Sequence, residues 1–301
     1  MTPRDAIIGV LVVLLWGGAF VWVEIGLHEF PPIFAASLRF TFSSLPFLFF
    51  VSRDGVPWRW IVTIGLTFVL MFVAMYVGMR MGVPAGLTSV VLQAQVLFTV
   101  LLAPLLLNDH AGPWKIAGVI LGIGGIALIG FNQPTGESFT ALLLVVVAAF
   151  FYGLISIWMK MAKVRNLSGL IVWVSLVPPL PLLLLSLLFE EGQLDAVINV
   201  TLPGALSVLY TSVLGTVVPF ILWGRLLARY SAHIVAPFAL LIPVIGMTSA
   251  VFFLGERFSA TTIYASLLIV GGLSVIIWGE ALYARYVKVA DVAPLNVEEA
   301  P

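Results

Sequence analysis

The sequence contains no cysteine and few charged residues. Without cysteine, the chain can form no disulfide, no thiolate metal site and no cysteine nucleophile. Charged residues make up only 9% of the chain, and 14 basic residues balance 14 acidic ones, so no basic surface for nucleic acid is expected. The three histidines, His28, His110 and His233, lack the spacing of a zinc motif. The sequence therefore predicts no metal, no cofactor and no nucleic-acid partner.

Apolar residues are far more abundant than in a soluble domain. They make up 61% of the 301 residues, and the mean hydropathy is +1.16, whereas a soluble domain is about half apolar and about a quarter charged. Ten apolar segments are each about 18 to 24 residues long, enough to cross a hydrocarbon core of ~30 Å. They cover 6–27, 32–52, 60–80, 84–106, 113–131, 139–161, 168–189, 203–227, 232–254 and 260–280. We predict an all-α membrane protein with ten transmembrane helices in contact with lipid.

The two halves of the chain repeat each other. Trp16 and Glu24 match Tyr152 and Lys160 at one offset, since 152 − 16 and 160 − 24 are both 136. Asp109 and Glu256 differ by 147, as do Gly124-Gly125 and Gly271-Gly272. The predicted units are residues 1–135, residues 136–285 and a disordered tail, 286–301. Because each unit has an odd number of spans, the second unit enters the membrane from the opposite side, which is the inverted repeat of secondary transporters.

The distribution of basic residues predicts the orientation. With the amino terminus inside, 11 of the 14 Lys and Arg residues lie at the cytoplasmic ends of the spans, and only Arg80 and Arg257 lie at the outer ends. Short cytoplasmic loops are enriched in Lys and Arg. We therefore expect both termini in the cytoplasm.

Three stretches carry a family resemblance: LLWGGAFVWVEIGL from Leu14, PAGLTSVVLQAQVLFTVLLAPLLLND from Pro84 and APFALLIPVIGMTSAVFFLGERF from Ala236. They resemble the EamA family of the drug/metabolite transporter superfamily, in particular bacterial exporters of O-acetylserine and cysteine. The resemblance covers nearly the whole chain. It implies ten helices around a central cavity, in the bacterial inner membrane, that export amino acids or their derivatives. Family members often have lysine where this chain has Glu24, while the repeat-related Lys160, a further candidate for substrate binding, is retained.

Glu24 and Arg39 are the first candidates for substrate binding. A central arginine costs about 2.5–3.5 kcal/mol on insertion scales, so Arg39 should face the protein interior and pair with an anion. Glu24 is the nearest acid in depth. Either this pair engages a charged substrate, or it is a structural ion pair between the first two helices. Proton antiport through Glu24 is a hypothesis, which a transport rate insensitive to a pH gradient would exclude.

Gln93 and Gln95 are further candidates for substrate binding, because their side-chain amides lie in a run that is otherwise apolar. Side chains two residues apart on an α-helix point ~200° apart, and an amide in lipid would leave donors and acceptors without partners. We expect one to face the cavity, with a preference for Gln93, and the other to face a neighbouring helix. Two hydrogen bonds between helices are the alternative.

Prolines and aromatic residues complete the candidate site. Pro237 and Pro243 interrupt one span, and each frees a backbone carbonyl that could contact a substrate ammonium; a permanent kink is the alternative. Five aromatic residues fall on spans that line the cavity in the family, although ordinary packing explains most membrane aromatics. They are Trp16, Tyr76, Tyr152, Trp158 and Trp223. Gly118, Gly122 and Gly125 predict a close helix contact.

Two other classes of protein share some of these features. A membrane enzyme of lipid metabolism needs clustered carboxylates or a nucleophile with a base, whereas the acids here are scattered, so we predict no enzyme. An exporter or uniporter of another small metabolite or of a drug-like amphiphile is the alternative, and a channel can share the composition of a uniporter. The expected partners are a small-molecule substrate and membrane lipid, with a monomer or a homodimer as the assembly.

Overall fold

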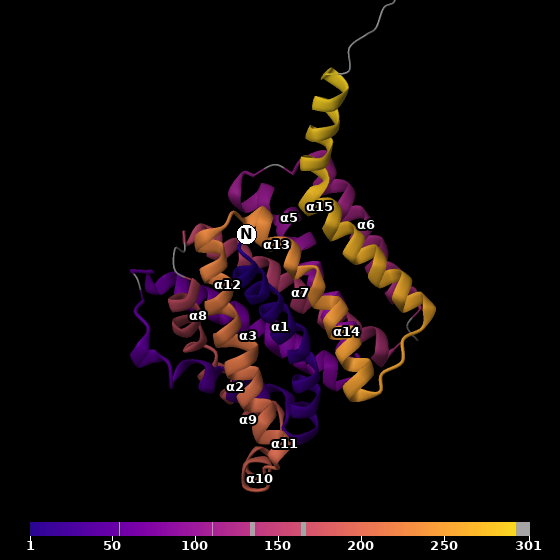
Figure 1. Cartoon of the computed structure of the whole chain (residues 1–301). Helices are drawn as coiled ribbons and strands as arrows, with labels where there is room; N and C mark the ends of the chain where they lie inside the picture. Colours follow the sequence, from indigo (N-terminus) through magenta and orange to yellow (C-terminus); the bar gives the residue numbers. More distant parts are fainter. Residues whose placement is uncertain (54, 110, 133–135, 164–166, 293–301) are drawn as a thin grey trace, which may run out of the picture.

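The computed structural model describes residues 1–53, 55–109, 111–132, 136–163 and 167–292. In this part of the chain ten helical spans are long and apolar enough to cross a membrane, and they match the ten predicted segments to within a few residues. Figure 1 shows them as one bundle, in which the amino terminus and the end of the last helix lie at the same face, here the terminal face. The opposite face, where α10 lies, is here the far face. The predicted all-α membrane fold is confirmed.

Several spans are built from more than one helix. The elements are α1 (Pro3–Glu29), α2 (Pro32–Ser44), η1 (Leu48–Phe50), α3 (Trp58–Arg80), α4 (Ala85–Val91), η2 (Leu92–Ala94), α5 (Gln95–Leu107), α6 (Pro113–Phe131), α7 (Glu137–Met161), α8 (Leu167–Ser175), α9 (Pro179–Phe189), α10 (Gln193–Ile198), α11 (Leu202–Leu209), η3 (Tyr210–Val217), α12 (Val218–Arg229), α13 (Ala232–Ala239), α14 (Leu241–Leu254) and α15 (Ala260–Val292). The fourth span changes to a 3₁₀ turn at η2, and the eighth to a π-helix at η3. Both irregular segments border the cavity described below.

The helices of the two halves pack in matching pairs. The first span, α1, packs against the ninth span at α14, and its repeat partner α7 packs against the fourth span at α5. Likewise α7 packs against α3, and α1 packs against η3 and α12 of the eighth span. Exchanging the two halves turns the contact of α1 with α14 into that of α7 with α5. It also turns the contact of α7 with α3 into that of α1 with the eighth span, as the internal repeat requires.

Glycine lets the fifth and tenth spans, α6 and α15, approach closely. A Cβ atom on Gly118 would lie 2.5 Å from the carbonyl oxygen of Gly272, and one on Gly272 would lie 2.5 Å from that of Gly118. Gly125 meets the backbone of α15 in the same way, at the carbonyl of Ala265. Small residues allow such backbone contact in membranes, where helices gain little from apolar burial. The predicted packing role of these glycines agrees with the structure.

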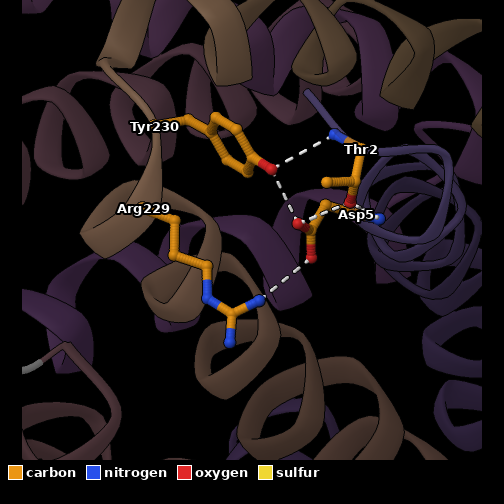
Figure 2. Close-up of polar contacts among 4 residues, drawn as sticks. All are labelled: Thr2, Asp5, Arg229 and Tyr230. Carbon is orange, nitrogen blue, oxygen red and sulfur yellow. Dashed lines mark hydrogen bonds and ion pairs between the residues drawn. The ribbon is translucent and has the colours of Figure 1, made fainter.

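A polar cluster joins the start of α1 to the end of α12 at the terminal face (Figure 2). Asp5 Oδ2 accepts hydrogen bonds from the hydroxyl of Tyr230 at 2.7 Å and from Thr2 Oγ1 at 2.8 Å, while Arg229 Nη1 lies 3.4 Å from Asp5 Oδ1. Thr2 also caps α1 by accepting from the Asp5 amide at 3.2 Å. The cluster therefore fixes one end of α1 against the second half of the chain.

Carboxylates cap two helices at the far face. Glu190, after α9, accepts hydrogen bonds from the amides of Ile33 at 2.7 Å and Phe34 at 3.1 Å, at the start of α2. Glu256, after α14, accepts from Ala85 at 2.7 Å and Gly86 at 3.1 Å, at the start of α4. These amides have no partner within their own helix, and the helix dipole favours an anion there. Both caps join the second half of the chain to the first.

The expected disordered tail was placed too early. Helix α15 continues to Val292, so residues 286–292 are helical; residues 293–301 lie outside the described residues. The stretch from Ala281 to Val292 contains no glycine or proline, and Ala, Leu, Arg and Lys favour a helix.

Candidate functional site

A cavity of about 310 Å³ lies between the two halves of the bundle. The first half contributes α1, α2, α3, η2 and α5 to its wall, and the second half contributes α7, α8, η3, α12, α13 and α14. The wall reaches Met159 and Leu167, at the end of α7 and the first residue of α8 at the terminal face. Toward the far face it ends at Val23 and Met75, more than one helical turn short of the ends of α1 and α3. The cavity is therefore displaced toward the terminal face.

Arg39 is the single charged residue among the described residues of the cavity wall. The residue is 8% exposed, and the side-chain contacts that it makes with the described residues are with neutral groups. Its Nε and Nη2 atoms donate to Thr216 Oγ1 at 3.1 and 2.9 Å, Nη2 donates to the carbonyl of Gly215 at 3.3 Å, and Nη1 donates to the hydroxyl of Tyr76 at 3.4 Å. The ring of Phe72 lies 4.8 Å from the guanidinium carbon. This set of contacts orients the positive charge without neutralising it.

The π-helix η3 supplies two of these acceptors. In a π-helix the backbone bonds skip one residue more than in an α-helix, and such segments recur at functional sites. The hydroxyl of Thr216 donates to the carbonyl of Thr211, five residues earlier, at 2.9 Å, and its oxygen accepts from Arg39. Sequence reasoning missed Thr216 and Gly215, because neither stands out in an apolar span and both lie far from Arg39 along the chain. The threonines and glycine of YTSVLGTV are the one local signal of an irregular segment.

Gln93 and Gln95 both border the cavity. The expectation that only one would do so is wrong, because Gln93 lies within the 3₁₀ turn η2 and Gln95 follows it directly as the first residue of α5. On a 3₁₀ helix, with three residues per turn, side chains two positions apart differ in direction by ~120°. On an α-helix the difference is ~160°, which is the ~200° rotation given above measured the shorter way round. Gln93 is also 6% exposed and donates from Nε2 to the carbonyl of Ala239 at 3.1 Å. It therefore combines the cavity role with a hydrogen bond between helices.

Pro243 explains why the carbonyl of Ala239 is available. Proline lacks the amide that would bond to the carbonyl four residues earlier, which here is that of Ala239. The freed carbonyl was expected to contact a substrate, but in the structure it accepts from Gln93. Pro243 itself does not belong to the described cavity wall, whereas its neighbour Ile242 does.

The expected ion pair between Glu24 and Arg39 is absent from the described residues. Glu24 Oε1 lies 3.5 Å from His28 Nε2 on the same helix, and Glu24 Oε2 is buried without a hydrogen-bond partner. Nearness in depth does not include direction: Arg39 points to α3 and η3, whereas Glu24 turns toward the next turn of α1. Glu24 also lies outside the described cavity wall.

The remaining candidates divide between the cavity and other places. Trp16, Tyr152 and Trp223 line the cavity, and the rings of Trp16 and Trp223 lie 5.4 Å apart across the two halves. Tyr76 contributes through Arg39. Trp158 instead lies 6.1 Å from the ring of Trp60, and Lys160 bonds to Asp109 at 2.8 Å in a smaller cavity of about 140 Å³. Substrate binding by any of these residues stays a prediction.

The chain matches the model of the EamA-like transporter family twice, over residues 4–131 and 139–278. The protein belongs to the EamA-like transporter family. The two matches coincide with the two halves of the bundle, so each half is one EamA unit, and together they form a multi-pass membrane transporter.

Curated relatives of this EamA protein are similar along their whole length. A protein of Salmonella typhimurium named "Probable amino-acid metabolite efflux pump" is 34% identical over 288 residues, covering 93% of this chain and 96% of the relative. A protein of Escherichia coli with the same name is 32% identical with the same coverage. The uncharacterized transporter YoaV of Bacillus subtilis is 24% identical and covers 87% of this chain. A solved crystal structure that is 20% identical superimposes with a TM-score of 0.65 over 95% of this chain and 99% of that chain, which supports the fold.

Proposed function

We propose that the protein exports small amino-acid metabolites across the bacterial inner membrane by alternating access, with the central cavity as the binding site and both termini in the cytoplasm. O-Acetylserine, cysteine and related amino acids are the first cargo to test. The observation that carries the proposal is the position of the cavity between two EamA units of opposite direction. In inverted-repeat transporters, rocking of one unit against the other exposes such a site to each side in turn.

Two further observations support this reading. The relatives named as amino-acid metabolite efflux pumps cover almost the entire chain. The cavity wall is displaced toward the terminal face, while the Glu190 and Glu256 caps hold the far face together. With the termini in the cytoplasm, we interpret this arrangement as the state that accepts cargo from inside the cell.

Transport by purified protein in proteoliposomes tests the proposal. Vesicles loaded with unlabelled O-acetylserine or amino acid should take up the labelled compound by counterflow, with saturable kinetics. Counterflow separates a carrier from a channel, because a channel shows no acceleration by substrate on the opposite side. Failure of all amino-acid cargo to exchange, in vesicles where the protein is folded, would refute the proposed function.

A matched pair of variants links transport to the cavity. Ser156 lines the cavity and donates to the carbonyl of Tyr152 at 3.3 Å, while Thr248 makes the same kind of bond, to Val244, on an exposed face of α14. Ser156→Trp should abolish counterflow by filling the cavity, and Thr248→Trp should leave it near the wild-type rate. Equal rates in the two variants would place the transport path elsewhere.

The lining of the cavity favours one second candidate, export of drug-like amphiphiles. Aromatic and methionine side chains such as Phe68, Met71, Met75 and Phe220 form much of the wall, and such surfaces adapt to varied apolar ligands. Expression in a strain without other efflux pumps would then raise resistance to apolar cations or dyes. Unchanged resistance, together with amino-acid counterflow, would exclude it.

A further inference from the structure

The guanidinium of Arg39 can accept an anion from the cavity. An arginine carries five N–H donors in a planar fork, and four hydrogen bonds to neutral acceptors are found here, of which that from Nη1 is the longest at 3.4 Å. Nε and Nη2 share Thr216 Oγ1, so the edge that carries Nη1 is the less occupied one. Tyr76, its partner, is buried behind the described cavity wall.

The positive charge has no counter-ion in the described residues. No Asp or Glu lies within the 4.0 Å limit of an ion pair with Arg39, and none belongs to the described cavity wall. A buried cation without an anion is unfavourable. A carboxylate that enters the cavity would relieve this cost and can bind a guanidinium through two parallel hydrogen bonds.

The rest of the cavity offers no matching anion for a cationic group. The other polar side chains of the described wall are neutral, namely Gln93, Gln95, Tyr152, Ser156 and Thr216, besides the indoles of Trp16 and Trp223. Gln93 already donates to Ala239. The remaining wall is aliphatic, aromatic or methionine. One end of a ligand therefore meets a fixed positive charge, and the other end meets uncharged surface.

We propose that Arg39 is the carboxylate-binding residue of this transporter, and that the site selects monocarboxylates with an uncharged, largely apolar remainder. This inference rests on the proposed function and specifies its cargo. A free amino acid binds through its carboxylate, while its ammonium finds only neutral acceptors and aromatic faces. A metabolite whose amino group is acylated loses that desolvation cost and binds more tightly. A cationic amine or a dicarboxylate is a poor ligand.

Four ligands that differ in one charge at a time test the selectivity. They are N-acetyl-L-leucine with the carboxylate alone, L-leucine with both charges, L-leucinamide with the ammonium alone and N-acetyl-L-leucinamide with neither. In thermal-shift and calorimetric titrations of the purified protein, N-acetyl-L-leucine should bind most tightly and L-leucinamide least. The two carboxylates should bind at least about tenfold more tightly than their amides, as expected for a charged bidentate contact. Amides that bind as well as the carboxylates, or no binding by either carboxylate, would overturn the inference.

Variants of arginine assign the selectivity to one residue. Arg39→Gln should abolish the preference for carboxylates, and Arg39→Lys should keep part of it, because lysine retains the charge but lacks the fork. The control is Arg59→Gln, which removes an exposed arginine that lies 5.6 Å from the ring of Trp60. Retention of the full carboxylate preference in Arg39→Gln would overturn the role of Arg39. Where Arg39→Gln does not fold, Arg39→Lys and the wild-type ligand series decide.

The transport assay keeps the two proposals apart. Counterflow of amino acids by the wild type, without a difference between carboxylates and amides, would refute the carboxylate site and leave the exporter proposal standing. Absence of counterflow for every amino-acid metabolite, with carboxylate binding still dependent on Arg39, would refute the exporter and retain the binding site. Each outcome therefore concerns one proposal.

Discussion

Gln93 donates its side-chain amide to the backbone carbonyl of Ala239, 3.1 Å away in the other half of the chain. That carbonyl is available because Pro243, four residues later, has no amide to offer. A glutamine of one EamA unit thus completes the helix of the other unit. The contact lies at the cavity wall, to which both Gln93 and Ala239 belong.

The first prediction concerns the coupling of Gln93 to Pro243. Gln93→Leu leaves the Ala239 carbonyl without its partner and should lower the stability of the protein by about 0.5–2 kcal/mol. Pro243→Ala restores an amide within the helix, so Gln93→Leu should cost less in that background. Thermal unfolding in detergent of the four proteins of this cycle measures the difference. Equal costs in both backgrounds would show that the two residues act independently.

The second prediction concerns the glycines between α6 and α15. Gly272→Ala places a methyl group 2.5 Å from the carbonyl oxygen of Gly118, so it should destabilise the protein by about 1–3 kcal/mol through overpacking. The neighbouring Gly271 meets only the Leu121 side chain, at 3.6 Å, and Gly124 has open space. Gly271→Ala and Gly124→Ala should be neutral or should stabilise by up to about 1 kcal/mol through helix propensity. Equal melting temperatures for Gly272→Ala and Gly271→Ala would contradict the close packing.

The third prediction concerns the terminal-face cluster. Tyr230→Phe removes the hydroxyl that donates to Asp5 and accepts from the Thr2 amide, and should cost about 1 kcal/mol in thermal unfolding. Asp5→Asn should cost at least as much, since it also removes the charge that faces Arg229. The matched control is Tyr264→Phe, at a side chain 65% exposed. A loss of stability as large in the control as in Tyr230→Phe would deny the cluster a role.

The fourth prediction concerns pH. Burial raises the pKa of the Glu256 carboxyl above its ordinary value of 4.5, and the hydrogen bonds from Gly86 and Ala85 offset part of that increase. The folded state therefore holds this proton more tightly than the unfolded chain, and stability decreases as pH rises through 4.5 toward the folded pKa. The melting temperature of the wild type relative to Glu256→Gln should be highest near about pH 4 and should fall by about pH 7.

The control for pH is Glu191→Gln, which removes an exposed carboxyl of the same face. Its difference from the wild type should show a weaker dependence on pH. A wild-type advantage over Glu256→Gln that grows with pH would mean that the two backbone hydrogen bonds outweigh burial at this carboxyl.

The sequence predicted the spans well and the site only in part. Long apolar runs and a constant offset between the halves are local or periodic signals, and they located the ten spans and the repeat. The partners of Arg39 carry no such signal, because Thr216 and Gly215 lie more than 170 residues away and are reached through a π-helix in an apolar stretch. Depth along a helix can be counted, but the face of a side chain changes with every irregular turn. The irregular turn η2 is why Gln93 and Gln95 both border the cavity. The wrong pairing of Glu24 with Arg39, on two regular helices, arises because depth along a helix does not give the direction of a side chain.

The paired carboxylates of Glu190 and Glu256 bear on how a cargo molecule would leave. A conformation that parts the two EamA units at the far face would withdraw acceptors from the amides of Ile33, Phe34, Ala85 and Gly86 together. Water would then form hydrogen bonds with those amides and with both carboxylates. Opening the far face would therefore hydrate these groups, and closing it would remove that water again. In the proposed alternating-access cycle, two acidic side chains outside the cavity wall would then set the relative stability of the two conformations.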